Sequence, residues 1–299
     1  MAAQYDYDIL MFGHFAKDRN VVDGQVEIAS GGAVFFGSVA VHRIGLRVAI
    51  VTRLRPDDMF RLDELKQEEI GVYAQAASET SGIENTYNSA DMERRTCKLL
   101  GYAGPMQIAD IPSVTARIYA ITPIIAGEFD LAYLEALAAR GPVALDVQGF
   151  VRMPEGKDLI SRPWKEIAEG LKRVTYLKVD RAEAELLTGE TDLAVAARKL
   201  NAYGPREIVL TQAAGLTVFA DEQIYYAPFT PRSLAGRTGR GDTCFMSYLS
   251  RRLATTAADA CCFAAAVTTL KQEKPGPWRG TIDDVQAVMA KQSGAAALH

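Results

Sequence analysis

The sequence predicts an α/β protein, a three-layer α/β/α domain on a mostly parallel sheet with a small β-strand lid. Short β-branched or apolar runs alternate with longer segments of helical period, which is the pattern of βα units around a buried sheet. The chain of 299 residues is long enough to bury a large core. Two segments, richer in polar residues, break the alternation and predict the lid.

The elements follow one another in βα order, and each is bounded by turn residues. The expected parallel strands are Tyr7–Gly13, Val48–Arg53, Arg117–Thr122, Val143–Val147, Val174–Asp180 and Glu207–Thr211. The expected helices are Ala33–Ile44, Asp57–Ile70, Asp130–Ala139, Pro163–Leu171, Ala182–Leu187 and Leu193–Tyr203. Beyond them, Leu216–Ala220 and Gln223–Phe229 predict an antiparallel hairpin at the sheet edge, and the chain ends in helices.

The lid is predicted from two distant pieces of chain, at about 14–30 and 72–101. Both alternate polar and apolar residues between turns, as solvent-facing strands do. Insertions between the units of an α/β sheet often cover a binding site. No repeat or linker appears, so residues 1–292 are expected to form a single domain, with 293–299 as a tail outside the fold.

Composition excludes several classes of protein. A formal net charge of -4, with Lys and Arg scattered along the chain, predicts no nucleic-acid partner. The N-terminus lacks the features of a secretory signal, and no apolar run approaches the roughly 18 residues of a membrane span. A cytoplasmic protein that does not bind membranes is therefore expected. The cysteines form no CxxC pair and predict reduced core thiols (Cys97, Cys244, Cys261 and Cys262).

The stretch "GRTGRGDTCFMSYLSRRL", Gly236–Leu253, has the most chemical content. Its RGD triplet would need an exposed loop on an exported protein to act in adhesion. The stretch also fits neither the dinucleotide fingerprint nor the Walker loop. A helical apolar stripe follows the glycines and places Gly239 to Asp242 at a helix N-terminus, where backbone N–H groups can hold an anion. Asp242 could then act as a general base beside a bound phosphate, or it could simply cap the helix.

This stretch resembles the TGAGD-type signature of the ribokinase/PfkB family of carbohydrate kinases. The resemblance implies a ribokinase-like fold and ATP-dependent transfer of the γ-phosphoryl group to a hydroxyl. It also implies that Asp242 is the catalytic base and that the amides of Gly239, Arg240 and Gly241 belong to an anion hole. Arg240 stands where the family usually has a small residue.

The N-terminal region is similar to the family in its sugar-binding elements. The stretch "GGAVFFGSVAVHRIG" resembles the N-terminal signature, which implies that Gly31 and Gly32 help to hold the acceptor. Phe36 stands where the family commonly has Asn. Asp18 matches an Asp that binds sugar hydroxyls in the family, and the alternative is a solvated lid carboxylate.

Three other segments resemble nucleotide-binding elements. In "YLKVDRAEAELLTG", Asp180 and Glu183 match an NxxE element, which implies that Glu183 organises Mg²⁺ through water. The same two residues also predict a capping box. In "VLTQAAGLTVF", the resemblance implies a nucleotide turn with Thr211 and Gly215, although Ala213 replaces its first glycine. Gly276 matches a loop that flanks the adenine.

Acceptor identity is predicted from "VALDVQGFVRMPEG", which follows a buried strand and resembles the "DxQGFxR" stretch of inositol kinases in the family. It implies that Gln148 and Arg152 bind the acceptor beside Asp146. Lid residues could bond further hydroxyls (Asn85, Asn88, Arg94 and Arg95). We expect a myo-inositol-like polyol first, and another sugar or a nucleoside next. A homodimer through the lid is a possible assembly.

The departures at Phe36, Asp180, Ala213 and Arg240 leave one alternative from another class open. This alternative is a ligand-binding or regulatory protein that keeps the kinase fold without catalysis. An oxidoreductase is disfavoured because the dinucleotide fingerprint is missing.

Overall fold

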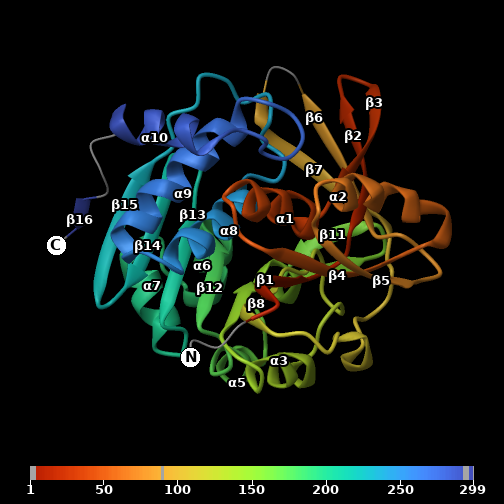
Figure 1. Ribbon diagram of the computed structural model, residues 1–299, viewed down its shortest axis with the longest axis horizontal. Coiled ribbons are helices and arrows are strands. Elements are labelled where there is room, and N and C mark those ends of the chain that lie inside the picture. The colour runs from red at the N-terminus through yellow and green to blue at the C-terminus, as the bar shows by residue number, and fades with distance from the viewer. Residues whose placement is uncertain (1–4, 89–90, 292–295, 299) are drawn as a thin grey trace.

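The computed structural model describes residues 5–88, 91–291 and 296–298, and its body is a ten-stranded sheet. The strands of this sheet are β1 Tyr7–Phe12, β4 Val48–Leu54, β5 Gly71–Ala76, β8 Ala116–Ile121, β9 Val143–Asp146, β12 Tyr176–Asp180, β13 Glu207–Thr211, β14 Gly215–Ala220, β15 Gln223–Pro228 and β16 Ala296–Leu298. Their order is β16-β15-β14-β13-β12-β9-β8-β1-β4-β5. From β5 to β13 the strands run parallel, and the other three are antiparallel, so the predicted mostly parallel sheet is confirmed (Figure 1).

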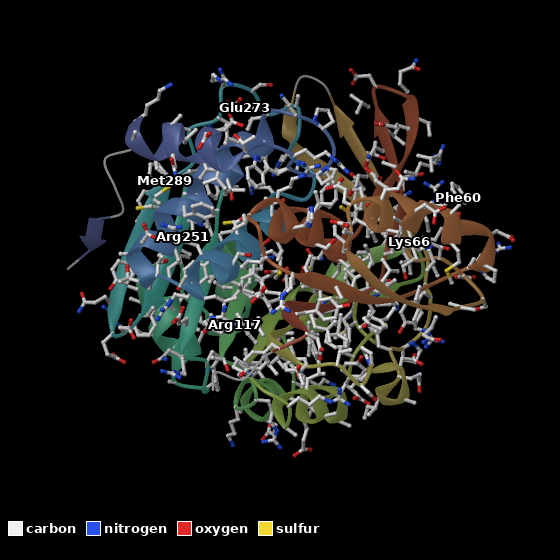
Figure 2. The ribbon with its side chains drawn as sticks, in the orientation of Figure 1. Phe60, Lys66, Arg117, Arg251, Glu273 and Met289 are labelled. Atoms are coloured by element: carbon white, nitrogen blue, oxygen red, sulfur yellow. The ribbon has the colours of Figure 1, made fainter. Side chains whose placement is uncertain are left out.

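Helices cover both faces of this sheet. They are α1 Ala33–Arg43, α2 Asp63–Gln67, α3 Leu131–Ala138, α4 Gln148–Val151, α5 Ile167–Leu171, α6 Arg181–Thr188, α7 Leu193–Asn201, α8 Arg240–Arg252, α9 Ala257–Gln272 and α10 Ile282–Lys291, with 3-10 turns η1 Pro56–Leu62 and η2 Ile108–Asp110. Successive residues of a strand point to opposite faces. Accordingly, Ile9 and Met11 of β1 pack with α1, α8 and α9, whereas Leu10 and Phe12 pack with α3, α6 and α7. Side chains fill the space between the layers (Figure 2).

A second, six-stranded sheet forms the lid, in the order β10-β11-β7-β6-β2-β3. Its strands are β2 Ala16–Val22, β3 Gln25–Gly31, β6 Gly82–Asn88, β7 Asp91–Gly101, β10 Arg152–Glu155 and β11 Asp158–Ser161. The hairpin β2–β3 turns at Asp23 and Gly24, whose φ angles of 48° and 84° suit the tight turn that Asp-Gly favours. The two distant pieces of chain therefore pair as expected, β2 beside β6.

The structure differs from the expected boundaries at five places. The expected helix over 57–70 is instead the 3-10 turn η1 followed by the five-residue helix α2, which ends before Glu69 because that residue takes a φ of 57°. Residues 71–76 form β5 in the main sheet rather than part of the lid, because they pair with β4. The hairpin β10–β11 joins the lid through β7, and the sequence analysis did not anticipate it. Helix α5 begins only at Ile167, four residues after Pro163. Residues Ala296–Leu298 of the expected tail pair with β15.

Two further expectations concern the whole chain. All four cysteines are free thiols; Cys244 and Cys261 are buried as predicted for core thiols, whereas Cys97 and Cys262 are only partly buried. Within the part of the chain that the structure describes, no helix has both the length and the apolar character needed to cross a membrane.

Candidate active site

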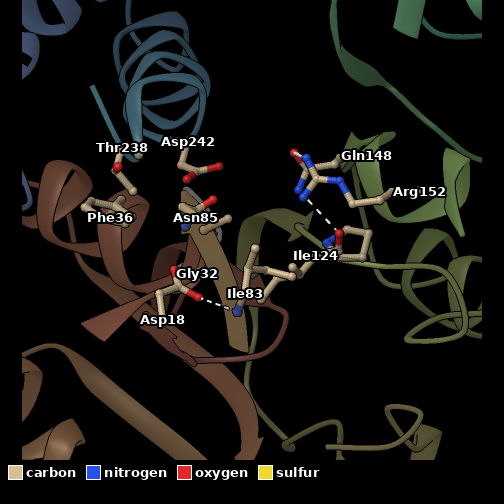
Figure 3. A pocket seen from close by; sticks show the side chains of 13 residues that line it. Asp18, Gly32, Phe36, Ile83, Asn85, Ile124, Gln148, Arg152, Thr238 and Asp242 are labelled. Atoms are coloured by element: carbon tan, nitrogen blue, oxygen red, sulfur yellow. Dashed lines mark hydrogen bonds between the residues drawn. The ribbon is translucent and has the colours of Figure 1, made fainter. Parts of the chain in front are cut away.

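A cavity between the lid and the carboxyl edge of the main sheet brings together residues from distant parts of the chain. We call it the acceptor cavity; it is lined by Asp18, Gly32, Ala33, Phe36, Ile83, Asn85, Pro123, Ile124, Gln148, Arg152, Thr238, Gly239 and Asp242. Figure 3 shows Asp242 at the N-terminal end of α8, Asp18 and Asn85 on the lid, and Gln148 and Arg152 on the opposite wall. Seven of the residues that the sequence predicted to bind substrate or to act in catalysis therefore share one cavity: Asp18, Gly32, Asn85, Gln148, Arg152, Gly239 and Asp242.

The N-terminus of α8 forms one wall of the cavity. Gly239 is the N-cap with a φ of 80°, and a Cβ there would lie 2.3 Å from the ring of Phe36. Only glycine combines this left-handed conformation with such close packing. Asp242 lies in the first turn of the helix. The N–H of Arg240 bonds to the carbonyl of Arg237 at 3.2 Å, so this amide of the predicted anion hole is already engaged within the protein.

The lid wall depends on Asp18 and on the turn into α1. The buried Asp18 accepts the N–H of Ile83 at 2.9 Å, which ties β2 to β6 and holds the carboxylate at the cavity. Gly32, the N-cap of α1, has a φ of 88°, and a Cβ there would lie 2.5 Å from the carbonyl oxygen of His14. Gly31 does not line the cavity but packs against the Asp18 carboxylate. Asp18 is therefore a buried, oriented carboxylate rather than a solvated one.

The opposite wall is formed by the short helix α4 after β9. Gln148 donates its side-chain amide to the carbonyl of Ile124 at 3.5 Å and accepts from the guanidinium of Arg152 at 2.9 Å. The backbone N–H of Gln148 bonds to Asp146 at 3.0 Å. These contacts orient an amide and a guanidinium, groups that can bond several hydroxyls of one acceptor.

A buried lysine lies behind the N-terminus of α8. Lys178 in β12 is 3.0 Å from Asp146 and 3.8 Å from Glu183, measured from its Nζ to the carboxylate oxygens. A Cβ on Gly241 would lie 3.6 Å from this Nζ. Burial alone would lower the pKa of Lys178, but the carboxylates of Asp146 and Glu183, with help from Asp180 and Asp242, raise it above its usual value. Lys178 is therefore held in its charged form, in an ion pair with these carboxylates.

A second buried lysine approaches from α9. Lys271 donates from Nζ to the carbonyl of Gly236, and the Nζ lies 5.5 Å from the ring centroid of Phe36. Burial lowers the pKa of Lys271 to about 8, and the charge of Asp242 partly offsets this. The Lys271 ammonium and the positive end of a helix dipole thus act near Asp242, which favours an anionic ligand.

Asp180 and Glu183 form the capping box that the sequence predicted. The N–H of Glu183 bonds to Asp180 at 2.8 Å, and the N–H of Asp180 bonds to Glu183 at 2.6 Å. Burial raises the pKa of Glu183, with the Lys178 ammonium opposing the shift. Among the described residues, no cluster of three or more His, Cys, Asp or Glu side chains could hold a metal ion.

The remaining residues predicted to bind nucleotide lie outside the acceptor cavity. Thr211 ends β13 and is buried, and Gly215 begins β14 opposite Pro228 of β15. The turn between them is held by the carbonyl of Ala214, which accepts from Phe229 and from the hydroxyl of Tyr226. Gly276 lines a second, larger cavity that shares Asp18, Phe36 and Thr238 with the acceptor cavity.

Sequence reasoning missed some of the site. Lys178 and Lys271 were not singled out, although a lysine inside the apolar run "YLKVD" was a usable signal, because a buried lysine needs partners. Ile83 and the Pro123–Ile124 segment carry no chemical signature in the sequence. Asn85 lines the acceptor cavity as the lid prediction suggested, whereas the side chains of Asn88, Arg94 and Arg95 lie outside the described residues.

Comparisons with known proteins indicate the family of this chain. The family model described as pfkB family carbohydrate kinase matches residues 3–281. A pyrophosphate-dependent kinase in the ribokinase family, solved with a pyrophosphate analog and myo-inositol, is 35% identical with a TM-score of 0.86, covering 93% of this chain and 99% of that one. A pyrophosphate-dependent myo-inositol-1 kinase converted into a myo-inositol-3 kinase is 34% identical with a TM-score of 0.85, covering 95% and 99%.

More distant structures share the fold. Ribokinase of Arabidopsis thaliana, solved with ribose and ATP, is 17% identical with a TM-score of 0.75, covering 95% of this chain and 98% of that one. No curated protein matches the chain significantly. The match over residues 3–281, together with relatives above 30% identity, shows that this chain belongs to the pfkB family of carbohydrate kinases, which are phosphotransferases with an alcohol group as acceptor.

Proposed function

We propose that the protein transfers a phosphoryl group to a hydroxyl of a cyclic polyol, with myo-inositol as the first candidate. The observation that carries the proposal is the acceptor cavity, in which Asp18, Asn85, Gln148 and Arg152 surround Asp242 at the N-terminus of α8. A ring of hydroxyls needs several polar partners on more than one side, and these residues come from both walls. The inositol-bound relative supports the choice of acceptor.

The reaction follows from the place of Asp242. Its carboxylate takes the proton of the acceptor hydroxyl as that oxygen attacks the terminal phosphorus of the donor. The new O–P bond forms while the bond from phosphorus to the donor's bridging oxygen breaks, and the remainder of the donor leaves with that electron pair. The first turn of α8 stabilises the negative charge that builds up on the transferred group.

For the donor, we propose pyrophosphate in preference to the ATP that the sequence motifs suggest. The buried ammonium group of Lys271 supplies positive charge close to Asp242, which suits a small, highly charged anion. Arg240, the first residue of α8, adds a second cation in the same turn as Asp242. The relatives at 34–36% identity are pyrophosphate-dependent. A pyrophosphate donor would explain why Arg240 stands where the family usually has a small residue.

The described residues do not fit a magnesium ion bound directly by side chains. Asp146 and Glu183 already face the Lys178 ammonium, and Glu183 also accepts the N–H of Asp180. Carboxylates balanced in this way have little charge left for Mg²⁺. We therefore assign no step of the reaction to a metal held by these residues.

The test is a matrix of donors and acceptors. Pyrophosphate and ATP, each with and without Mg²⁺, are incubated with myo-inositol, other polyols, sugars and nucleosides, and the phosphorylated product is measured by mass spectrometry. We expect product with pyrophosphate and myo-inositol. Product with ATP but none with pyrophosphate would overturn the donor assignment and leave the kinase function standing.

The non-catalytic alternative is separated by the same matrix. A pure binding protein would bind an acceptor saturably and give no phosphorylated product with any donor. Asp242 lines the acceptor cavity in the first turn of α8, with Gly239 as the N-cap and Gly241 between them, which supports the enzyme.

A further inference from the structure

A buried carboxylate outside the acceptor cavity joins the two walls of that cavity. Glu128 lies in the loop that follows β8, and its solvent exposure is 0%. Its Oε1 accepts the backbone N–H groups of Ile124 at 2.7 Å and Ile125 at 2.9 Å. Its Oε2 accepts the backbone N–H of His14 at 3.4 Å, in the connection from β1 to the lid strand β2. One side chain thus holds backbone from two separate segments.

Each of these segments leads directly to residues of the acceptor cavity. Ile124 lines the cavity, and its carbonyl accepts the side-chain amide of Gln148, which in turn holds Arg152. On the other side, the carbonyl of His14 lies against Gly32, and β2 begins two residues later and carries Asp18. A change in the hydrogen bonds of Glu128 would therefore alter the separation of the two walls.

Two other connections between the main sheet and the lid also lie beside Glu128 and His14. Ser81, immediately before β6, bonds through Oγ to His14 Nδ1 at 2.7 Å and accepts the N–H of Ala103 at 3.0 Å. Tyr102, immediately after β7, donates its hydroxyl to the carbonyl of Gly127 at 2.5 Å. His14 Nδ1 also lies 3.5 Å from Glu128 Oε2, so Ser81 and Glu128 compete for one nitrogen.

We propose that Glu128 is a positioning residue for the acceptor: its carboxylate holds the wall of Asp18 and Gly32 and the wall of Ile124, Gln148 and Arg152 at the separation that the acceptor needs. The inference rests on the proposed kinase function and deepens it, because it assigns acceptor affinity to a residue that does not touch the acceptor.

The charge of Glu128 links this role to pH. Burial raises the pKa of Glu128 to about 7, with the N–H groups of Ile125, Ile124 and His14 and the charge of Arg152 opposing the shift. Burial and the Arg53 guanidinium lower the pKa of His14 to about 3, and burial raises the pKa of Tyr102 to about 12, so these neighbours stay neutral. Below pH 7 a proton on Oε2 replaces an acceptor with a donor beside the His14 N–H, and acceptor binding should weaken.

The experiment compares Glu128→Gln with Glu207→Gln. Glu207 is also a buried glutamate with short bonds, to Tyr248 and Arg252, but it begins β13 at the opposite end of the strand from the site. Both variants should lower the melting temperature. In Glu128→Gln the new side-chain amide would place a second donor opposite the His14 N–H. Only this variant should therefore raise the KM for myo-inositol, by about tenfold, and its kcat should change much less. It should also flatten the dependence of that KM on pH between 6 and 8, about one unit either side of the titration.

A second variant covers the case in which Glu128→Gln does not fold. Tyr102→Phe removes the bond to Gly127 in the same loop without touching a buried charge, and it should raise the KM by about threefold. The proposal is overturned if Glu128→Gln, or Tyr102→Phe where the first variant does not fold, leaves the KM and its pH profile as in the wild type. Calorimetric titration with myo-inositol measures acceptor binding without turnover. An inactive wild type would therefore contradict the kinase function alone, whereas unchanged binding in the variant would contradict the role of Glu128.

Discussion

At the scale of single residues, Asp242 combines two roles that separate substitutions can distinguish. It lies in the acceptor cavity and in the first turn of α8. Asp242→Asn keeps the size of the side chain but removes the base, so kcat should fall by at least ~10²-fold while donor and acceptor still bind. Assays of product formation measure kcat, and calorimetry with each substrate measures donor and acceptor binding. Turnover near that of the wild type would show that another group accepts the proton.

Lys271 is the residue from which we expect a pH dependence in donor binding. Its pKa of about 8 means that its charge is lost as the pH rises through that value. The KM for pyrophosphate should therefore increase between pH 7 and 9, which bracket that pKa by about one unit, and Lys271→Met should raise it by about tenfold at pH 7 and remove the dependence. The exposed Lys274, three residues along, is the matched control, and Lys274→Met should behave as the wild type.

The sign of the stability effect of Lys271 can be worked out separately. Because the folded-state pKa lies below that of a free lysine, the folded chain binds fewer protons between the two values. The free energy of unfolding contributed by this group therefore rises with pH above about 8. Denaturant titrations of wild type and Lys271→Met at pH 7 and 9.5 test this sign. If the lysine stayed charged in the folded chain, the difference between the two proteins would be the same at both pH values.

At the scale of elements, the N-terminus of α8 is fixed by packing against α1. Gly239→Ala places a methyl group against the ring of Phe36 and forces a left-handed φ on alanine. We expect a loss of ~1–2 kcal/mol from the backbone alone, and a fall of about 2–4 °C or more in melting temperature. The double variant Gly239→Ala, Phe36→Ala should recover the part that comes from the clash. Equal stability of wild type and single variant would mean that the helix start is not constrained.

The alternation of strands and helices was readable from the sequence because local periodicity determines it. The resemblance of the stretch around Asp242 also pointed to the cavity. The hairpin β10–β11 was missed because its partner, β7, is distant in the chain and no local pattern encodes that pairing. Lys178 was missed for a related reason, because its ion pairs with Asp146 and Glu183 form only in the folded sheet. Glu128 likewise gains a role only through the backbone it holds.

At the scale of the whole molecule, the outer face of the lid suggests an assembly. Val26, Ile28 and Leu100 are each about half exposed, at 49%, 50% and 49%, and the first two share one face of β3. We propose a homodimer in which two such faces pack together, as an isologous interface requires. Sedimentation equilibrium should give twice the chain mass for the wild type and a monomer for Ile28→Glu. Val195→Glu, an exposed valine on α7 far along the chain, is the control and should leave the mass unchanged.

The wall that the two cavities share has a practical consequence for inhibition. Asp18, Phe36 and Thr238 line both the acceptor cavity and the larger one beside Gly276, so a single molecule can contact both spaces around the Phe36 ring. A cyclic polyol joined by a short linker to a group that fills the larger cavity would lose its translational freedom only once, and would bind more tightly than either half alone. The resemblance to the family implies an Asn where this chain has Phe36, so such a linked compound would be selective for enzymes that carry an aromatic ring there.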